Sequence, residues 1–259
     1  MPPRALRPSG LILVDKPAGP TSFDVIARIR RRTGARTGHA GTLDPFATGL
    51  LLVLSGAATR LAPWLVGLDK RYLTDVDLSS RTSTGDPEGE VVEELDPPDA
   101  AELEHRLAGL RGEVELPIPA ASAVKIGGER AYSLHRRGEV VEMPVRRSRV
   151  EVLELVSYED GVARLDLRVG SGTYVRSIAG ALDGHCVTLR RLEVGPFSAE
   201  VADEERILPP AEALPFLPAV AVTAEEAAAI RGGRRHAAAD TCTLLDGELV
   251  AVGRVVMPL

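Results

Sequence analysis

The chain has 259 residues, of which 44% are apolar and only 3% aromatic, and its formal net charge is −6. This length suits one large domain, or one domain with a small appendage. No stretch approaches the roughly 18 apolar residues of a membrane span, and the N-terminal segment lacks the pattern of a signal peptide. Cys186 and Cys242 lie far apart without metal-ligand spacing, so we expect neither a disulfide framework nor a zinc site. We therefore expect a cytoplasmic protein.

The charges are unevenly distributed along the chain. Residues 28–36 contain five arginines and no acid, whereas residues 86–115 contain eleven Asp or Glu and two arginines. Such segregation can present a basic groove to a polyanion, although it equally fits the solvated faces of ordinary helices. Only three of the 31 basic residues are lysines, namely Lys16, Lys70 and Lys125. Each is a candidate for a position where a compact ammonium suits better than a guanidinium.

The first part of the chain predicts a strand followed by a capped helix. Residues 10–17 form a short apolar run that ends in a charged turn, which is typical of a strand. Thr21 or Ser22 can cap the next helix, with Asp24 completing a capping box. Apolar residues within 22–33 recur at the spacing of one buried stripe, and Gly34 marks the end. The arginines fall on the exposed side, where they could meet phosphates.

The stretch 38–45, with the sequence GHAGTLDP, has the features of a functional loop around Asp44. Its glycines permit a sharp turn or a close approach to another molecule. Pro45 biases Asp44 toward an extended backbone, so the carboxylate is presented from a stiff, non-helical segment. The apolar run 48–54 predicts a buried strand or helix that anchors the loop. A tight turn in which Asp44 only caps local N–H groups explains these residues equally well.

The middle of the chain predicts both strands and helices. Alternation from Tyr72 to Leu78 indicates a strand with one buried face, and residues 79–90 have the composition of a loop. Asp99 is placed to cap a helix with buried leucines. Turn residues predict hairpins across 127–128 and across 159–161. Further helices are predicted at 57–65, at 130–137 and after 170–176, and a further strand at 187–194.

The composition changes at 207–223, where four prolines interrupt the chain. Residues 224–259 predict one helix and a hairpin across 246–247, which together make a small β-rich module. We therefore divide the chain into a main domain at 1–206, a linker at 207–223 and a module at 224–259. Strands joined both by hairpins and by helices indicate an α+β fold, with a mixed, mostly antiparallel sheet and flanking helices.

Several motifs occur together and in the order of one known family. The segment 38–51, GHAGTLDPFATGLL, closely resembles the signature of the bacterial tRNA pseudouridine-55 synthases, the TruB family. Five other segments match the pattern of that family: 15–22, 69–72, 122–125, 172–176 and 189–192. The resemblance covers residues 10–198, and the number of ordered motifs makes it specific. It implies a pseudouridine synthase fold for the main domain and an RNA-binding PUA-like fold for the C-terminal module.

The resemblance implies isomerisation of the uridine at position 55 in the T-loop of tRNA. The base must be flipped out of the loop before its glycosidic bond can change from N–C to C–C. Asp44 matches the catalytic aspartate of the family, Arg176 the arginine that pairs with it, and Tyr72 the tyrosine stacked against the target base. An adjacent guanidinium favours the ionised carboxylate. The sequence leaves open whether Asp44 attacks the base or the ribose.

The resemblance also implies substrate-binding roles for seven further residues: His39, Lys16, Lys70, Lys125, Tyr174, Leu192 and Asp86. His39 matches a residue that fills the space around the displaced nucleotide, and Leu192 an apolar wall of the pocket. The three lysines and Asp86 either bind RNA or brace the pocket. The expected partner is the T-stem-loop of tRNA. No cofactor, metal or obligatory protein partner is implied, and the absence of heptads favours a monomer.

Three features depart from the pattern of the family. The chain between Arg176 and 189 is several residues shorter than usual, and the segment before the His is reduced to 183–185. The C-terminal module is short for a PUA domain, although Arg231, Arg234 and Arg235 could still contact RNA. Ala40 replaces a usual Thr. A non-catalytic tRNA-binding or tRNA-folding protein is the alternative function, while a guide-dependent synthase fits the short tail less well.

Overall fold

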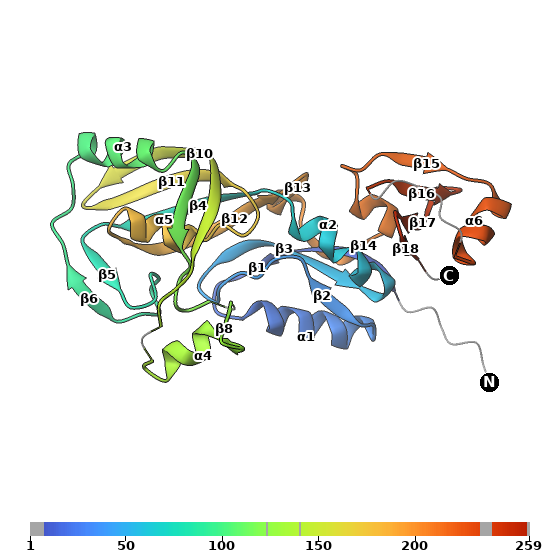
Figure 1. Cartoon of the computed structure of the whole chain (residues 1–259), viewed down its shortest axis with the longest axis horizontal. Helices are drawn as coiled ribbons and strands as arrows, with labels where there is room; N and C mark the ends of the chain where they lie inside the picture. Colours follow the sequence, from blue (N-terminus) through green and yellow to red (C-terminus); the bar gives the residue numbers. More distant parts are fainter. Residues whose placement is uncertain (1–7, 123, 140, 234–239, 258–259) are drawn as a thin grey trace. The chain divides into compact units, whose positions relative to one another are not determined.

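Antiparallel strands with short flanking helices make up the structure, as the sequence predicts (Figure 1). The computed structural model describes residues 8–122, 124–139, 141–233 and 240–257. The chain divides into two units. The first comprises the segments before Asp69 and after Leu192, and the second comprises Asp69–Leu192. Within the described ranges, no helix is long and apolar enough to cross a membrane.

Strands β1, β2, β3 and β14 of the first unit form an antiparallel group. Strand β1 lies between β3 and β14, with Gly10 opposite Ser55 and Lys16 opposite Gly49 in the β1–β3 pair, and the short β2 pairs with β3. Strands β1 and β3 are buried on both faces because α1 covers one side and η1 and α2 the other (Figure 1). The bounds are β1 (Gly10–Lys16), α1 (Ser22–Thr33), β2 (Thr37–His39), β3 (Thr48–Ser55), η1 (Gly56–Leu61), α2 (Ala62–Val66) and β14 (Asp203–Leu208).

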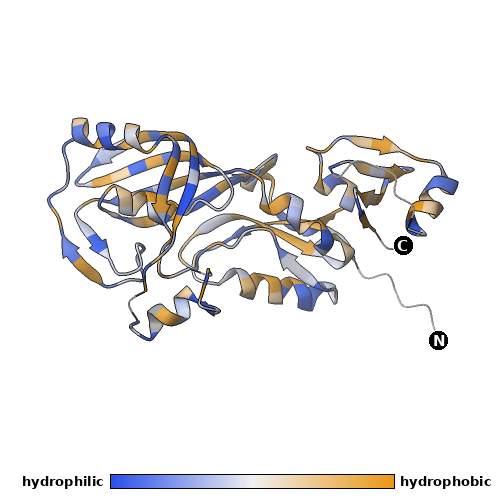
Figure 2. Ribbon diagram, in the orientation of Figure 1, coloured by the Kyte–Doolittle hydropathy of each residue, from blue (hydrophilic) through white to orange (hydrophobic). Residues whose placement is uncertain are grey.

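Helix α1 confirms the predicted caps. Thr21 is the N-cap and forms a capping box with Asp24, and Gly34 ends the helix in the left-handed region at φ 63°. Hydrophobic and hydrophilic residues alternate along the helix in Figure 2, and Val25 and Ile29 are buried. The prediction of one helix at 57–65 is partly wrong, because the first part of this segment is the 3-10 helix η1. Helix α2 then accommodates Pro63 in its first turn, where no hydrogen bond from its nitrogen is needed.

The second unit contains five neighbouring strands in the order β12-β4-β11-β10-β7. The β4–β11, β11–β10 and β10–β7 pairs are antiparallel. Burial alternates along β4 as the sequence predicts, with Tyr72, Thr74 and Val76 on the buried face. Helix α3 packs against β10, and α5 against β7. The bounds are β4 (Lys70–Asp77), α3 (Ala100–Gly109), β7 (Gly112–Pro117), β10 (Val145–Glu159), β11 (Val162–Val169), α5 (Val175–Ala181) and β12 (His185–Val194).

Two predicted hairpins are confirmed, and one predicted loop is corrected. Asp160 and Gly161 turn β10 into β11 with φ 48° and 76°, and the glycines at 127 and 128 turn β8 (Lys125–Ile126) into β9 (Glu129–Arg130) ahead of α4 (Ala131–Arg136). The segment 79–90 is not all loop, because β5 (Ser80–Thr82) pairs with β6 (Val91–Glu94). Three residues are too few for a sequence pattern to show a strand, so the cross-strand partner decides the conformation.

The C-terminal part forms a four-stranded sheet in the order β15-β16-β17-β18, and α6 packs against β17. Strand β15 lies inside the segment 207–223 and pairs with β16 in parallel. Leu249, Val252 and Met257 belong to the same core cluster as Leu52 and Leu54 of β3, so within the first unit this sheet shares a core with β3. The remaining bounds are β13 (Phe197–Ser198), η2 (Ala199–Val201), η3 (Pro210–Ala213), β15 (Ala219–Ala221), α6 (Ala224–Arg231), β16 (Cys242–Leu245), β17 (Glu248–Val252) and β18 (Val255–Val256).

Candidate active site

The backbone on either side of Asp44 is fixed by contacts from α1 and from the turn before it. The Ser22 hydroxyl donates to the Leu43 carbonyl at 3.0 Å and accepts from the Leu43 amide at 2.9 Å. The Pro45 carbonyl accepts from the Gly19 amide at 2.9 Å. Asp44 itself is half-buried and lies outside helix and strand. The loop therefore presents its carboxylate from a backbone that is held one residue before and one residue after it.

Lys16 is a second residue that holds this loop in place. Its Nζ donates to three proline carbonyls: Pro17 at 2.9 Å, Pro20 at 2.8 Å and Pro45 at 3.1 Å. The side chain is fully buried, and an ammonium has three N–H donors. Three carbonyls around one nitrogen suit a compact ammonium and not a planar guanidinium. Of the two roles that the sequence leaves open for Lys16, this geometry favours bracing the pocket.

His39 is oriented by an aromatic contact at the start of the same segment. It ends β2, opposite Val53 of β3, and is half-buried. The ring of Phe23 meets the His39 ring edge to face, with centroids 5.7 Å apart and an interplanar angle of 86°. Phe23 is 67% exposed. A large exposed aromatic ring beside a histidine, next to the Asp44 loop, is a suitable surface for stacking an unpaired base.

The arginines of α1 fall into two groups. Arg28 and Arg32 pair with Glu204 and Glu205 of β14, and the hydrogen bond from Arg28 lowers the pKa of Glu204. The other three arginines of 28–36 are exposed and form no ion pair with any residue that the structure describes: Arg30, Arg31 and Arg36. The sequence therefore overestimates the number of arginines on this helix that could face phosphates, since two of them fasten it to β14.

In the second unit, Arg176 is buried in the first turn of α5. Its side chain forms an ion pair with Asp86, with Nη1 3.2 Å from Oδ2, and both side chains are almost fully buried. The guanidinium also donates to the carbonyl of Thr84 at 2.8 Å and to that of Ala121 at 2.9 Å. Three acceptors from two different loops therefore fix the plane of the guanidinium.

The loop that carries Asp86 is itself ordered around that carboxylate. Thr84 Oγ1 donates to Asp86 Oδ1 at 2.5 Å, and the Glu88 amide donates to the same oxygen at 3.1 Å. Gly85 has φ +72°, and a Cβ atom at this position would lie 3.7 Å from the Cβ of Arg176. The structure places the Asp86 carboxylate against Arg176, and of the two roles that the sequence leaves open this contact favours bracing.

Tyr72 and Lys70 lie on the buried face of β4. Tyr72 is opposite Leu167 of β11, and Lys70 is opposite Val169. Burial, reinforced by the charge of Arg191 on β12, lowers the pKa of Lys70 to about 8. Lys70 therefore loses its proton at a mildly alkaline pH, at which an exposed lysine keeps it.

The remaining predicted residues of this unit differ in burial. Tyr174 is the N-cap residue of α5, two positions before Arg176, and is half-buried. Leu192 lies in the second half of β12 and is half-buried, whereas Lys125 is exposed on β8. Its motif neighbour at 123 lies outside the described residues, as do Arg234 and Arg235 of the C-terminal module.

The shortened connection after Arg176 is a single tight turn. The amide of Gly184 donates to the Ala179 carbonyl at 2.9 Å, and Asp183 adopts φ 68°. Asp183 also pairs with Arg81 and Arg106. A side chain at 184 would meet the Asp77 carbonyl at 2.3 Å, so only glycine allows this close approach. The sequence signals the shortening, but these contacts depend on residues far along the chain.

The structure thus gathers the predicted residues into two groups, one in each unit. The Asp44 loop, Lys16 and His39 lie in the first unit. Tyr72, Lys70, Asp86, Tyr174, Arg176, Leu192 and Lys125 lie in the second. Sequence reasoning did not anticipate Ser22 as the contact that holds Leu43, nor the carbonyls of Thr84 and Ala121. Every residue has a backbone carbonyl, so the sequence does not show which carbonyl becomes an acceptor. A serine at the start of a helix is readily interpreted as an N-cap, which hides its contact with a distant residue.

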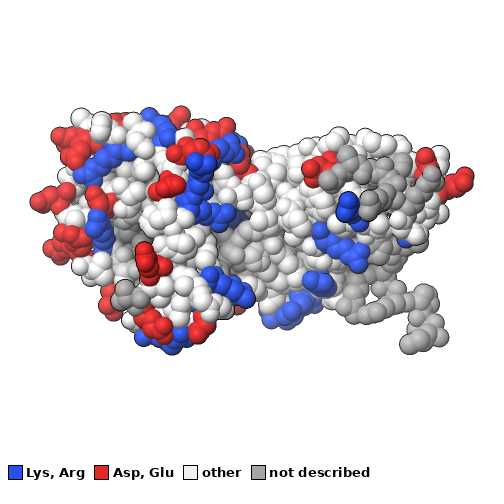
Figure 3. Space-filling view, viewed as in Figure 1, with Lys and Arg blue, Asp and Glu red and all other residues white. Residues whose placement is uncertain are grey.

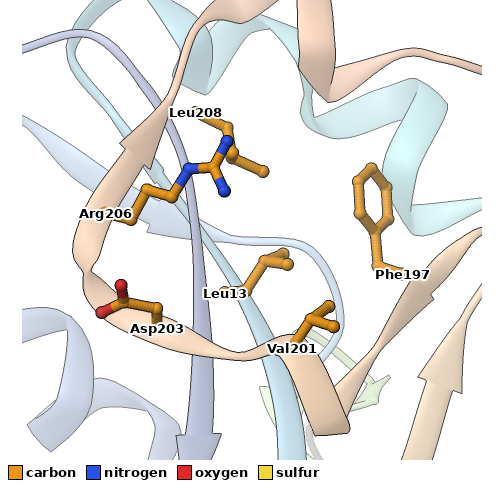
Figure 4. A pocket seen from close by; sticks show the side chains of 6 residues that line it. All are labelled: Leu13, Phe197, Val201, Asp203, Arg206 and Leu208. Atoms are coloured by element: carbon orange, nitrogen blue, oxygen red, sulfur yellow. The ribbon is translucent and has the colours of Figure 1, made fainter.

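A separate hollow lies beside the edge strand β14 of the first unit (Figure 4). Four apolar residues and two charged residues line it: Leu13, Phe197, Val201, Leu208, Asp203 and Arg206. None of the predicted site residues lines it. It is therefore distinct from the candidate active site.

Comparison with solved structures shows the fold. A chain in the crystal structure of a Cbf5-Nop10-Gar1 complex superimposes with a TM-score of 0.71 and 25% identity, covering 96% of this chain and 78% of that one. A chain in the structure of an H/ACA RNP bound to a substrate RNA containing 2'-deoxyuridine gives a TM-score of 0.71 at 22% identity. These matches confirm the predicted α+β pseudouridine synthase fold.

Sequence comparison then gives the family. The family model described as "TruB family pseudouridylate synthase (N terminal domain)" matches residues 29–175. The chain belongs to the TruB family. The tRNA pseudouridine synthase B of Leifsonia xyli subsp. xyli is 43% identical over 222 residues, covering 80% of this chain and 74% of that protein. That of Mycobacterium sp. (strain KMS) is 41% identical over 262 residues, covering 96% and 84%.

Proposed function

We propose that this chain converts the uridine at position 55 of the tRNA T-loop to pseudouridine. The chain belongs to the TruB family, and its similarity to tRNA pseudouridine synthases B extends over most of their length. Both findings support an isomerase that acts on tRNA. The observation that carries the proposal for this chain is the Asp44 loop, whose backbone is held on both sides of the aspartate. Fixed geometry is what a reacting carboxylate requires.

The reaction breaks the bond from N1 of the base to C1′ of the ribose and forms a bond from C5 to C1′. The hydrogen on C5 must leave, and N1 gains a proton. Asp44 is the proposed nucleophile or electrostatic partner for the detached base or ribose, and Arg176 keeps it ionised. In this proposal Tyr72 stacks on the base and is the candidate for the proton transfer at C5. The uridine must first leave its stack, and the His39–Phe23 pair is suited to fill or line the space it vacates.

Asp86 is the proposed positioning residue for Arg176. A guanidinium held by one carboxylate and two carbonyls keeps a fixed plane during the reaction. Lys16 braces the Asp44 loop through its hydrogen bond to the Pro45 carbonyl. Lys70, Lys125, Tyr174 and Leu192 complete the substrate-binding set in this proposal.

We also propose the following for the whole chain. Residues 1–206 form the catalytic domain, and 224–259 form a short PUA-like module that follows the segment 207–223. The T-stem-loop of tRNA is the partner, and the protein acts as a monomer in the cytoplasm without an obligatory protein partner. Arg231 is the described residue of the module's basic group that could reach RNA.

The test is release of tritium from a T-stem-loop transcript labelled at C5 of uridine. The unaltered chain should release tritium, because the hydrogen leaves C5 on isomerisation. Asp44→Asn should reduce the rate by at least about 1,000-fold while RNA binding persists. Asp24→Asn, which changes an exposed acid of the same unit, should leave the rate unchanged. Unchanged turnover in Asp44→Asn would remove Asp44 from the mechanism.

The alternative is a tRNA-binding or tRNA-folding protein that uses the same surface without catalysis. Flipping a base out of a folded loop already remodels the RNA, so the two roles can coexist. A stable complex of the unaltered chain with the transcript and no tritium release would favour the alternative. Activity on tRNA alone, with no guide RNA, would exclude a guide-dependent mechanism.

A further inference from the structure

The guanidinium of Arg146 rests directly on the backbone of Gly172. A side-chain carbon at Gly172 would lie 2.3 Å from Nη2, 2.5 Å from Cζ and 2.8 Å from Nη1 of Arg146. Carbon and nitrogen atoms that are not bonded do not approach so closely, so every residue other than glycine would push the guanidinium away. Gly172 also has φ +82°, which other residues rarely adopt. Arg146 and Gly172 therefore form a matched pair.

Arg146 lacks the acidic partner that three other arginines of the same sheet have. Arg71 pairs with Asp166, Arg149 with Asp69, and Arg164 with Asp75. Arg146 is exposed and makes no hydrogen bond or ion pair with any residue in the described ranges. Acidic and basic side chains are intermixed over the visible face of this unit (Figure 3), so an arginine without a carboxylate is not simply the result of a shortage of acids.

The position of this guanidinium ties it to the candidate site. Gly172 belongs to the loop between β11 and α5, and the next residues are Thr173, Tyr174 and, in the first turn of α5, Arg176. The loop is fixed, since the Gly170 amide donates to the Arg149 carbonyl at 2.8 Å and the Thr173 amide donates to the Gly170 carbonyl at 3.3 Å. Arg146 thus sits on a rigid turn that leads into the catalytic helix, with its N–H donors open to solvent.

We propose that Arg146, seated on Gly172, binds a backbone phosphate of the RNA substrate. This inference rests on the proposed function and adds to it a residue outside the motifs of the family. A guanidinium offers five N–H donors in a planar fork that matches two phosphate oxygens. The missing side chain at Gly172 leaves the space that this fork occupies beside the loop. Arg146 therefore sets the register of the RNA backbone beside α5.

The neighbouring residue offers a matched control. Arg147 follows Arg146 on β10, is equally exposed and likewise has no ion pair within the described ranges. Successive side chains of a strand point to opposite faces, and Arg147 stands opposite Glu115 of β7 where Arg146 stands opposite Leu116. Removing Arg147 changes the net charge by the same amount without touching the Gly172 seat.

The experiment measures equilibrium binding of a T-stem-loop RNA over a range of salt concentrations. A single phosphate contact contributes about 0.7 to 0.9 to the slope of log K against log salt. Arg146→Ala should lower the slope by about that amount and weaken binding about tenfold at low salt. Gly172→Ala should lower the slope and the affinity by similar amounts although it keeps the arginine, because the added methyl group displaces the Arg146 guanidinium. Combining the two should be no worse than Arg146→Ala alone, and Arg147→Ala should leave the slope unchanged.

Two results would overturn the inference. One is an unchanged slope in Arg146→Ala; the other is an equal loss in Arg147→Ala, which would indicate diffuse charge rather than a seated contact. Thermal unfolding of each variant, with Arg146→Met to retain the aliphatic stem, separates lost contacts from lost folding. Tritium release by the unaltered chain is measured in parallel. If it is absent, the proposed function fails, while the slopes still decide whether Arg146 binds RNA.

Discussion

The two units each use a buried cation to hold a loop of the candidate site, but with different partners. In the first unit, Lys16 donates to three proline carbonyls around the Asp44 loop. In the second, Arg176 donates to two carbonyls and pairs with the carboxylate of Asp86. Three carbonyls converge on the Lys16 ammonium, whereas the Arg176 guanidinium combines two carbonyls with an ion pair to a buried carboxylate.

This difference assigns the two cations different tasks. An ammonium that donates to three carbonyls from two separate segments links their backbones, which suits a brace of the Asp44 loop. A guanidinium with a buried counter-charge is electrically balanced but geometrically fixed, which suits a residue that must keep its orientation during a reaction. The consequences of removing each cation should therefore differ in size and kind.

The largest effect is expected for Arg176→Met. This change leaves the Asp86 carboxylate buried without its partner, which costs about 3–5 kcal/mol in the free energy of unfolding. Turnover should be lost at the same time. Chemical denaturation and tritium release measure the two effects. In the double variant with Asp86→Asn, much of the stability but none of the activity should return. Recovery of activity in the double variant would mean that Arg176 has no role beyond pairing with Asp86.

A smaller effect is expected for Lys16→Met, which leaves three carbonyls without their common donor. Hydrogen bonds to a charged group are worth more than neutral ones, and we expect a loss of about 3 kcal/mol. Lys16→Arg should not restore stability, because a planar fork cannot point three N–H groups at carbonyls that surround one atom. Full stability in Lys16→Arg would show that charge alone holds the Asp44 loop, and would remove the contrast with Arg176.

Ser22→Ala tests the other fastening of the Asp44 loop. The buried hydroxyl makes two hydrogen bonds to Leu43, so its loss should cost about 2 kcal/mol and lower the rate of tritium release. Thr21→Ala is the matched control one residue away. It removes the cap of α1 at a cost of about 1 kcal/mol without contacting the loop. Equal loss of turnover in both variants would show that helix stability, and not the position of Leu43, matters.

The last prediction concerns Lys70, whose pKa burial lowers to about 8 from an ordinary 10.5. Between these values the unfolded chain holds a proton that the folded chain has lost. The free energy of unfolding should therefore rise with pH across this window, by at most about 1.4 kcal/mol per unit. Below pH 8 both states are protonated and this dependence disappears. Lys70→Met should lack the rise between pH 8 and 10, measured by denaturant titration at each pH.

Local sequence patterns determined much of the fold. The capping box at Thr21, the glycine stop at Gly34, the alternation of β4 and the turn at 160–161 all involve residues within a few positions of one another. Such features are set by backbone sterics and short-range hydrogen bonds, which the sequence displays directly. The sequence also identified the family to which the chain belongs, and it predicts the Asp44 loop as the centre of the site.

Tertiary structure decided what holds the site residues. The acceptors of Arg176 lie 92 and 55 positions away in the sequence, and the Pro45 carbonyl bound by Lys16 lies 29 positions away. The pairing of β5 with β6 and the seat of Arg146 on Gly172 depend likewise on distant segments. A buried charge takes whichever acceptors packing brings within reach, and most of these are backbone carbonyls that every residue possesses. The sequence alone therefore shows which residues are unusual, and only the fold shows what each of them touches.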